Sequence, residues 1–203
     1  MSTKKFIVIE GIDASGKTTQ AELLKTHLIS LGGKAIISSE PSSGIIGNLI
    51  RQTLKKRIFF TADQNLFDEQ MAYLFAADRH DHLYNDIDGV YKLIKDDFDV
   101  ISTRYYFSSL AYNCQTPEQF DFIAKLNHQF PAPDLAIYLD IPVEVALERL
   151  KERSLHEIYE TREKLTQVRK NYQTIFADYS AKLLIIDGTK DPQSIQQEII
   201  AAL

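Results

Sequence analysis

Residues 6–18 of this chain read FIVIEGIDASGKT, and they set its architecture. The apolar run Phe6–Ile9 predicts a buried strand, and the residues from Gly11 to Thr18 follow it with the spacing G-x-x-x-x-G-K-T. A strand, a glycine-rich loop and a helix in this order form a cradle whose backbone N–H groups and helix dipole bind phosphate oxygens. The alternative is a glycine-rich turn that binds no nucleotide. The strand and helix on either side favour binding of a nucleoside triphosphate.

The motif assigns chemistry to particular side chains. Lys17 would place its charge on the β- and γ-phosphates, and the Thr18 hydroxyl would hold Mg²⁺. We expect the triphosphate to contact the loop and the first residues of the helix, which are Gly11, Ile12, Asp13, Ala14, Ser15, Gly16, Lys17, Thr18 and Thr19.

Length and composition describe an ordinary soluble globule. The 203 residues suit one domain, 1–203, with 44% hydrophobic and 25% charged residues. A net charge of −5 argues against a protein that coats nucleic acid or an anionic membrane. No apolar stretch approaches the roughly 18 residues of a membrane helix, and the first strand begins too early for a signal peptide. The one cysteine, Cys114, fits a reducing cytoplasm; a reactive nucleophile is the alternative.

Apolar runs alternate with helix-period segments along the rest of the chain. Four further strands are expected at residues 35–38, 98–101, 135–139 and 183–186, and apolar stripes at helical spacing cover 21–31, 67–83, 143–150 and 165–179. Short strands without alternation of apolar and polar residues, each followed by a helix, predict an α/β fold with a five-stranded parallel sheet covered by helices on both faces. Ligands then bind at the carboxyl ends of the strands.

Three classes of phosphate-cradle protein compete. A GTPase would carry the base-reading motif N/T-K-x-D, which the sequence lacks, and a motor ATPase would end an apolar strand in Asp-Glu, which is also missing. A kinase of nucleotides needs a second anion site made of arginines from several segments, together with a basic lid. The sequence has that pattern.

An ordered series of motifs resembles the thymidylate kinase family and covers nearly the whole chain. It comprises residues 6–20, Glu40-Pro41, Gly47, Ile50-Arg51, residues 74–79, Arg104-Tyr105, Ser108-Ser109, residues 111–113, Pro133-Asp134-Leu135 and residues 138–140. The resemblance implies a single-domain P-loop fold that transfers phosphate from Mg·ATP to dTMP, giving dTDP for dTTP synthesis. It also implies a homodimer, for which the apolar helix around Phe67–Phe75 is a candidate interface unless it is core.

The resemblance also implies how dTMP is held. Asp13 would accept a hydrogen bond from the 3′-hydroxyl, although it could instead stabilise its own turn. Phe75 and Arg79 are four residues apart, share a helix face and would stack on thymine and reach its carbonyl edge; core packing and an ion pair of Arg79 with Asp78 or Asp81 are the alternatives. The matching family positions also place Glu40, Ser108, Tyr112 and Asn113 around the acceptor, where a helix start and core packing explain the last three equally well.

Arginines complete the expected site. Arg104 follows a strand and therefore emerges at the carboxyl edge, where its planar fork suits the acceptor phosphate. Arg51 is a second candidate for that phosphate, or lies on an exposed helix face. The segment 149–162 resembles the family's lid, in which Arg149 would contact ATP and Arg153 would offset the charge of the transferring phosphoryl group; a salt-bridged surface helix is the alternative. We expect Lys17, Arg104 and Arg153 to be catalytic.

Two function classes remain as alternatives to the dTMP kinase. One is a kinase of another pyrimidine or deoxynucleoside monophosphate, because Phe75 and Arg79 do not by themselves exclude uracil. The other is a nucleotide-binding regulator with weakened turnover, and Thr103 is the residue that would indicate it. In the family pattern an Asp stands at this position, directly before the arginine, and is implied to orient Mg²⁺ waters or that arginine. Without the Asp, we expect metal affinity or rate to suffer unless Glu10 or Asp13 compensates.

We therefore predict that Thr103→Asp raises turnover or lowers the Mg²⁺ concentration that the enzyme requires, because a carboxylate restores charge that a hydroxyl lacks. Steady-state kinetics over a Mg²⁺ titration measures both quantities. If neither changes, position 103 takes no part in metal handling.

Overall fold

The computed structural model describes residues 4–151 and 158–203. Its strands are β1 (Phe6–Glu10), β2 (Lys34–Ile37), β3 (Phe98–Thr103), β4 (Leu135–Asp140) and β5 (Leu183–Asp187). Its helices are α1 (Lys17–Ser30), α2 (Ile45–Leu54), α3 (Gln64–Tyr84), α4 (Val90–Lys95), α5 (Tyr106–Tyr112), α6 (Pro117–Asn127), α7 (Val143–Lys151), α8 (Arg162–Ala177) and α9 (Pro192–Ala201). The strands form one sheet in the order β2-β3-β1-β4-β5, and every pairing is parallel. The predicted α/β fold is confirmed.

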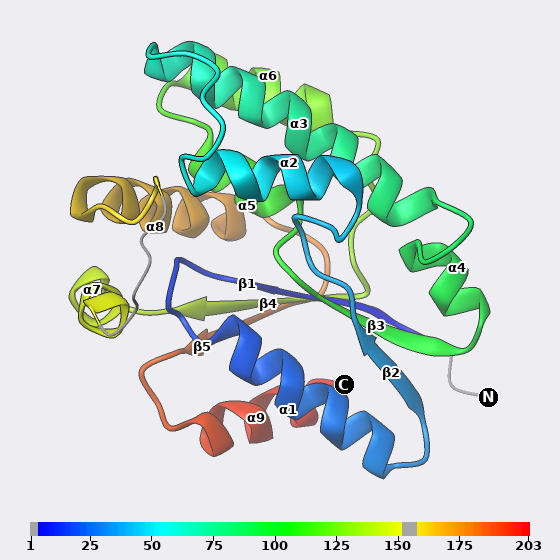
Figure 1. Cartoon of the computed structure of the whole chain (residues 1–203). Helices are drawn as coiled ribbons and strands as arrows, with labels where there is room; N and C mark the ends of the chain where they lie inside the picture. Colours follow the sequence, from blue (N-terminus) through cyan, green and yellow to red (C-terminus); the bar gives the residue numbers. More distant parts are fainter. Residues whose placement is uncertain (1–3, 152–157) are drawn as a thin grey trace.

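Two hydrophobic cores lie on opposite faces of the sheet. Helices α1 and α9 cover one face, while α2, α3, α5 and α8 lie on the other (Figure 1). Strand β1 contributes to both cores because successive side chains point to opposite faces. Ile7 and Ile9 pack with α1 and α9, whereas Phe6 and Val8 pack on the α5 and α8 side. Glu10, two residues after Val8, continues the second series and is fully buried.

The strand order brings functional loops together. β1 lies between β3 and β4, and β2 pairs with β3. The segments that leave β1, β2 and β3 therefore start from the same edge of the sheet, as expected for parallel strands that bind ligands at their carboxyl ends. The glycine loop, Ser39-Glu40 and Arg104 all belong to these segments.

The four helices predicted from apolar stripes correspond to α1, α3, α7 and α8. The other five helices of the described residues were not predicted from apolar stripes, and each is short, between 6 and 11 residues in length. Helix α6 did carry a readable signal, a capping box in which Thr116 and Gln119 bond each other's backbone. In the described parts of the chain, the structure contains no helix with the length and apolar character to cross a membrane.

Candidate active site

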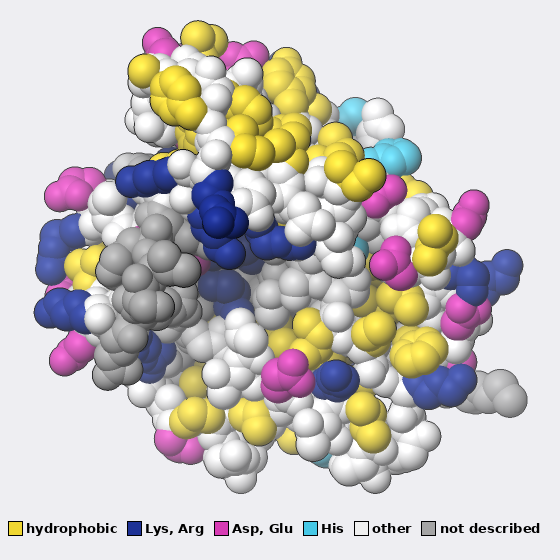
Figure 2. Space-filling view, in the orientation of Figure 1, with side chains coloured by type: hydrophobic (Ala, Val, Ile, Leu, Met, Phe, Trp, Pro, Cys, Tyr) yellow, Lys and Arg dark blue, Asp and Glu magenta, His cyan; other side chains and the backbone are white. Residues whose placement is uncertain are grey.

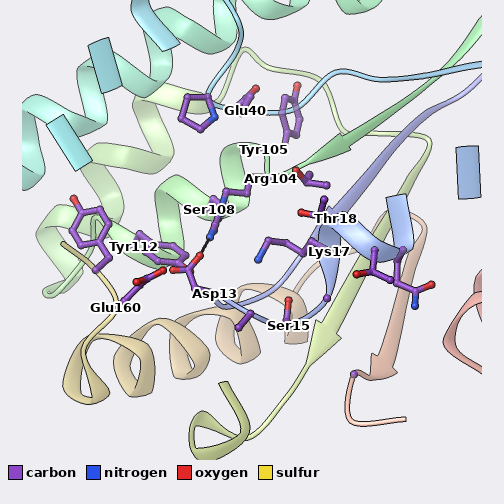
Figure 3. Close-up of a pocket in the computed structure, with 18 of the residues that line it drawn as sticks. Asp13, Ser15, Lys17, Thr18, Glu40, Arg104, Tyr105, Ser108, Tyr112 and Glu160 are labelled. Atoms are coloured by element: carbon purple, nitrogen blue, oxygen red, sulfur yellow. Dashed lines mark hydrogen bonds and ion pairs between the residues drawn. The ribbon is translucent and has the colours of Figure 1, made fainter. Parts of the chain in front are cut away.

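A cleft of about 630 Å³ opens at the carboxyl ends of the strands. The predicted site residues on its wall are Asp13, Ala14, Ser15, Gly16, Lys17, Thr18, Thr19, Glu40, Arg51, Phe75, Arg79, Arg104, Ser108, Tyr112 and Arg149. Figure 2 shows Lys and Arg side chains gathered in and beside the hollow near the middle of one face. Figure 3 shows how Asp13 and Lys17 of the glycine loop and Arg104, which follows β3, converge there.

The glycine loop adopts backbone conformations that other residues avoid. Gly11 has φ of 148°, and a Cβ there would lie 2.5 Å from the Ser15 hydroxyl oxygen and 2.7 Å from the Leu139 carbonyl oxygen. Gly16 has φ of 98° at the start of α1. Both values lie in the left-handed half of conformational space, where glycine alone is unstrained. The motif's two glycines are therefore required by the turn itself.

Lys17 is nearly buried and reaches back over the loop. Its Nζ donates hydrogen bonds to the carbonyl oxygens of Gly11 at 2.9 Å and Ile12 at 2.8 Å. Gly11 and Ile12 do not line the cleft, because Ile12 points into the core. The buried Ser15 hydroxyl has no hydrogen-bond partner in the part of the chain that the structure describes. Such an orphaned group at the base of an anion cradle suits a bound phosphate oxygen or its water.

Arg104 stands at the centre of the acceptor half of the cleft. Its Nη2 pairs with Asp13, its Nη1 donates to Ser108 Oγ at 3.2 Å, and its guanidinium lies 4.7 Å from the centre of the Tyr112 ring. Tyr112 Oη in turn donates to Asp13 at 3.0 Å. Burial by itself would lower the pKa of Arg104, but the surrounding groups, Asp13 first and then Tyr112, Tyr172 and Glu10, together raise the pKa well above its ordinary value. The guanidinium therefore remains charged.

The backbone of Arg104 is strained. Its φ is 82°, a conformation that costs a non-glycine residue about 1–2 kcal/mol. Its N–H donates to the Ile9 carbonyl at 3.0 Å, and its carbonyl accepts from Ser102 Oγ at 2.7 Å. These bonds continue the sheet past β3 and turn the side chain into the cleft.

Arg79 is held in a buried ion pair with Glu40. Its side chain is 1% exposed, as is that of Glu40, and its Nη2 lies 2.7 Å from the Glu40 carboxylate. Its Nη2 also donates to Ser109 Oγ at 3.1 Å, and its Nη1 donates to Asn127. The described partner is thus Glu40 rather than Asp78 or Asp81. Asp78 instead accepts hydrogen bonds from Ser42.

Arg51 and Phe75 also reach the cleft. Arg51 is half-buried and donates to the carbonyls of Pro41 and Ser42, so it does not lie on an exposed helix face. Phe75 is half-buried, packs against the core and still contributes to the cleft wall. The position of Phe75 is therefore compatible with both expected roles, core packing and contact with a ligand.

Two sequence expectations need correction. Asn113 is buried away from the cleft and donates to Tyr159 Oη at 3.3 Å, because it ends α5 on the side facing the lid's last residues. Glu10 cannot take over metal binding, since it is fully buried and accepts three hydrogen bonds. The role of position 103 in metal handling stays a prediction: Thr103 lies on the cleft wall, and its Oγ1 donates to Ser39 Oγ at 2.8 Å.

The lid segment is only partly described. Arg153 lies outside the described residues. Arg149 donates to the carbonyls of Ala14 at 3.1 Å and Gly188 at 3.3 Å, which ties α7 to the glycine loop. Arg162 is exposed and pairs with Glu144, so it is not directed at the cleft.

Sequence reasoning assigned no ligand contact to other residues of the wall. They include Tyr105, Ser109, Tyr159, Glu160, Gly188, Lys190, Pro192 and Ile195. The residues from Gly188 onward follow β5, so the rule that ligands bind at the carboxyl ends of strands could have found them. Tyr105 and Ser109 line the cleft from the start and body of α5, whereas Tyr159 and Glu160 line it from the residues just before α8.

A phosphate-binding loop and a separate group of arginines thus face each other across one cleft. On a parallel sheet of this kind, that arrangement is typical of the P-loop kinases that bind two nucleotides end to end and transfer a phosphoryl group between them. The family model for thymidylate kinase matches residues 9–199. The chain belongs to the thymidylate kinase family, and it is an ATP-dependent nucleoside monophosphate kinase.

Curated relatives match over almost the full length of both chains. A probable thymidylate kinase of Methanococcus aeolicus is 39% identical, with 98% of this chain and 95% of the relative covered. The probable thymidylate kinase 1 of Saccharolobus solfataricus is 37% identical, with 97% and 95% covered. A probable thymidylate kinase of Pyrococcus horikoshii is 34% identical, with 97% and 94% covered.

The buried pair of Arg79 and Glu40 generates a stability prediction. Glu40→Ala should lower the free energy of unfolding by about 3–5 kcal/mol, because it leaves the Arg79 charge buried without its counter-charge. Denaturant titration followed by circular dichroism measures this. The double variant Glu40→Ala/Arg79→Met should lose less than the sum of the two single variants. Additive losses would show that the two side chains are not coupled.

Proposed function

We propose that this chain transfers the γ-phosphoryl group of Mg·ATP to dTMP, giving ADP and dTDP for dTTP synthesis. The observation that carries the proposal is the pairing of two anion-binding halves in one cleft, the glycine loop with Lys17 and the acceptor half with Arg104. The family match and the relatives' names support dTMP as the acceptor.

The donor half suits ATP. Backbone N–H groups of the loop and the N-terminus of α1 face the β- and γ-phosphates, and Lys17 adds a positive charge. In the free protein Lys17 Nζ bonds loop carbonyls, so its charge lies beside the phosphate position. Arg149, which bridges the loop and Gly188, would border the nucleoside of ATP.

The residues present fit a magnesium ion that arrives with the nucleotide. Mg²⁺ usually keeps several waters and binds few protein groups together with substrate phosphates. Thr18 offers a hydroxyl on the cleft wall at the first turn of α1, and the described residues contain no cluster of three or more His, Cys, Asp or Glu that could hold a metal by itself. Thr18 would hold the ion, which supplies charge neutralisation at the phosphates.

The acceptor half suits a nucleoside monophosphate. Arg104, with Arg51 further along the wall, would bind its phosphate, and Asp13 would accept from the sugar 3′-hydroxyl. The Phe75 ring would stack on the base while Arg79 faces its edge. Arg79 is already fixed by Glu40 and Ser109, so it would meet the base without losing side-chain freedom.

The chemistry needs positioning more than proton transfer. The acceptor phosphate is ionised near neutral pH, so one of its oxygens can attack the γ-phosphorus while the bond from that phosphorus to the β-phosphate oxygen breaks and ADP leaves. Such a transition state is stabilised by surrounding positive charge. Lys17 serves the donor and Arg104 the acceptor, and Arg153 from the lid is the proposed third cation.

An acceptor survey tests the proposed function. Release of ADP by the purified protein should be fastest with dTMP among dTMP, dUMP, dCMP and dAMP, and excess EDTA should abolish it. A coupled spectrophotometric assay measures the rates. Faster release with another monophosphate would replace the substrate, and ATP binding without release for any acceptor would favour a regulator.

The proposal extends to a cytoplasmic homodimer. The single cysteine, Cys114, is a free buried thiol, which suits a reducing compartment. Phe67 and Met71 of α3 belong to the core rather than to an interface. The other side of the same helix exposes Leu66 and Tyr73, and Tyr73 meets Phe122 of α6 edge to face.

Tyr73→Asp should convert the dimer to monomers, because a carboxylate in the centre of an apolar interface leaves an unpaired charge. Light scattering coupled to size exclusion measures the mass. A wild-type mass of one chain would contradict the dimer.

A further inference from the structure

Glu10 is a buried carboxylate that the proposed chemistry does not use. It ends β1, immediately before the glycine loop, and its side chain is completely inaccessible to solvent. Its position in the strand turns it away from α1 and α9 and toward α5 and α8. A buried carboxylate is costly unless hydrogen bonds and opposite charge compensate it, so its partners indicate what it does.

Three donors from two segments surround this carboxylate. One oxygen accepts the backbone N–H of Tyr105 at 2.7 Å. The other accepts the hydroxyls of Ser108 and Tyr172, each at 2.7 Å. Burial raises the pKa of Glu10, while Tyr172, Arg104 and Ser108 act against that rise.

Two of the three donors also control Arg104. Tyr105 follows it directly, so the bond from Tyr105 N–H to Glu10 holds the peptide on the carboxyl side of the strained residue. Ser108 Oγ donates to Glu10 and accepts from Arg104 Nη1 at 3.2 Å. Glu10 therefore orients both the backbone and one nitrogen of Arg104 without touching the cleft.

A purely structural role for Glu10 would join β1 to α5 and α8 and nothing more. That role predicts that loss of Glu10 weakens the binding of every ligand, ATP included, because Glu10 adjoins the glycine loop. The geometry differs from that expectation, since two of its three hydrogen bonds end on groups that contact or adjoin Arg104.

We propose that Glu10 is a positioning residue that aims Arg104 at the phosphate of the acceptor nucleotide, acting through the Tyr105 N–H and the Ser108 hydroxyl. The inference rests on the proposed function in so far as Arg104 binds that phosphate. Tyr172 takes part in the same hydrogen-bond network, because its hydroxyl donates to Glu10 and also lies 2.8 Å from Ser108 Oγ.

The variant Glu10→Gln separates positioning from charge. Removing a negative charge would by itself strengthen binding of an anionic phosphate. Loss of positioning has the opposite sign, because the amide nitrogen cannot accept the hydroxyl hydrogens of Ser108 and Tyr172, so the hydrogen bond that fixes Ser108 beside Arg104 is lost. We expect the affinity for dTMP to fall roughly tenfold or more, with affinities for thymidine and ATP unchanged within about twofold.

Isothermal calorimetry with dTMP, thymidine and ATP measures these affinities, and steady-state kinetics should show a raised KM for dTMP with the KM for ATP unchanged. Tyr172→Phe should move dTMP affinity in the same direction by about threefold or more. Tyr138→Phe is the matched control. The Tyr138 ring contacts that of Tyr172, but its hydroxyl donates to Asp140 rather than to Glu10. This variant should leave the ratio of dTMP to thymidine affinity unchanged.

Several outcomes overturn the proposal: tighter dTMP binding by Glu10→Gln, an equal loss for dTMP and thymidine, or a matching loss in the control. If Glu10→Gln does not fold, Tyr172→Phe decides by the same ratio. A wild-type protein that phosphorylates a different monophosphate contradicts only the substrate assignment, and the same comparison is then made with that nucleotide and its nucleoside.

Discussion

Guanidinium groups buried in a protein of net charge −5 must each be matched by carboxylates, and this constraint shapes the acceptor half of the cleft. Arg104 is balanced by Asp13 at its tip and by Glu10 beneath it. Arg79 is balanced by Glu40. Each carboxylate holds its arginine in a fixed orientation. The hydrogen-bond donors that would meet a ligand phosphate or base have therefore already lost their side-chain conformational freedom.

The sheet topology supplies these matched charges from residues distant in sequence. Glu10 and Arg104 come from the ends of neighbouring strands β1 and β3, and Glu40 follows β2 on the far side of β3. Asp13 comes from the loop that also cradles the donor. Because Asp13 bonds Arg104 in the free protein, the two halves of the cleft are linked before any nucleotide enters.

Much of this arrangement could be predicted from the sequence, for reasons that differ by element. Short apolar runs predicted all five strands. The signal was clearest for β1 and β4, which are buried along almost their whole length and therefore show no alternation. The glycine loop was predicted because its motif encodes its own backbone geometry. Asn113 was misplaced, because whether a residue at the end of α5 faces the cleft or the protein interior depends on packing against α3 and α8. For the same reason, the sequence did not reveal that Tyr159 lines the cleft or that Glu40 is the partner of Arg79.

The positions of Glu10 and of the glycine loop both depend on the number of residues in β1. Because side chains alternate across a strand, inserting or deleting a single residue within Phe6–Glu10 would send Glu10 to the α1 and α9 face, among aliphatic side chains. The strand and loop therefore form an indivisible unit in evolution and in protein engineering. Any scaffold that receives this loop by grafting must also reproduce the parity of the strand before it.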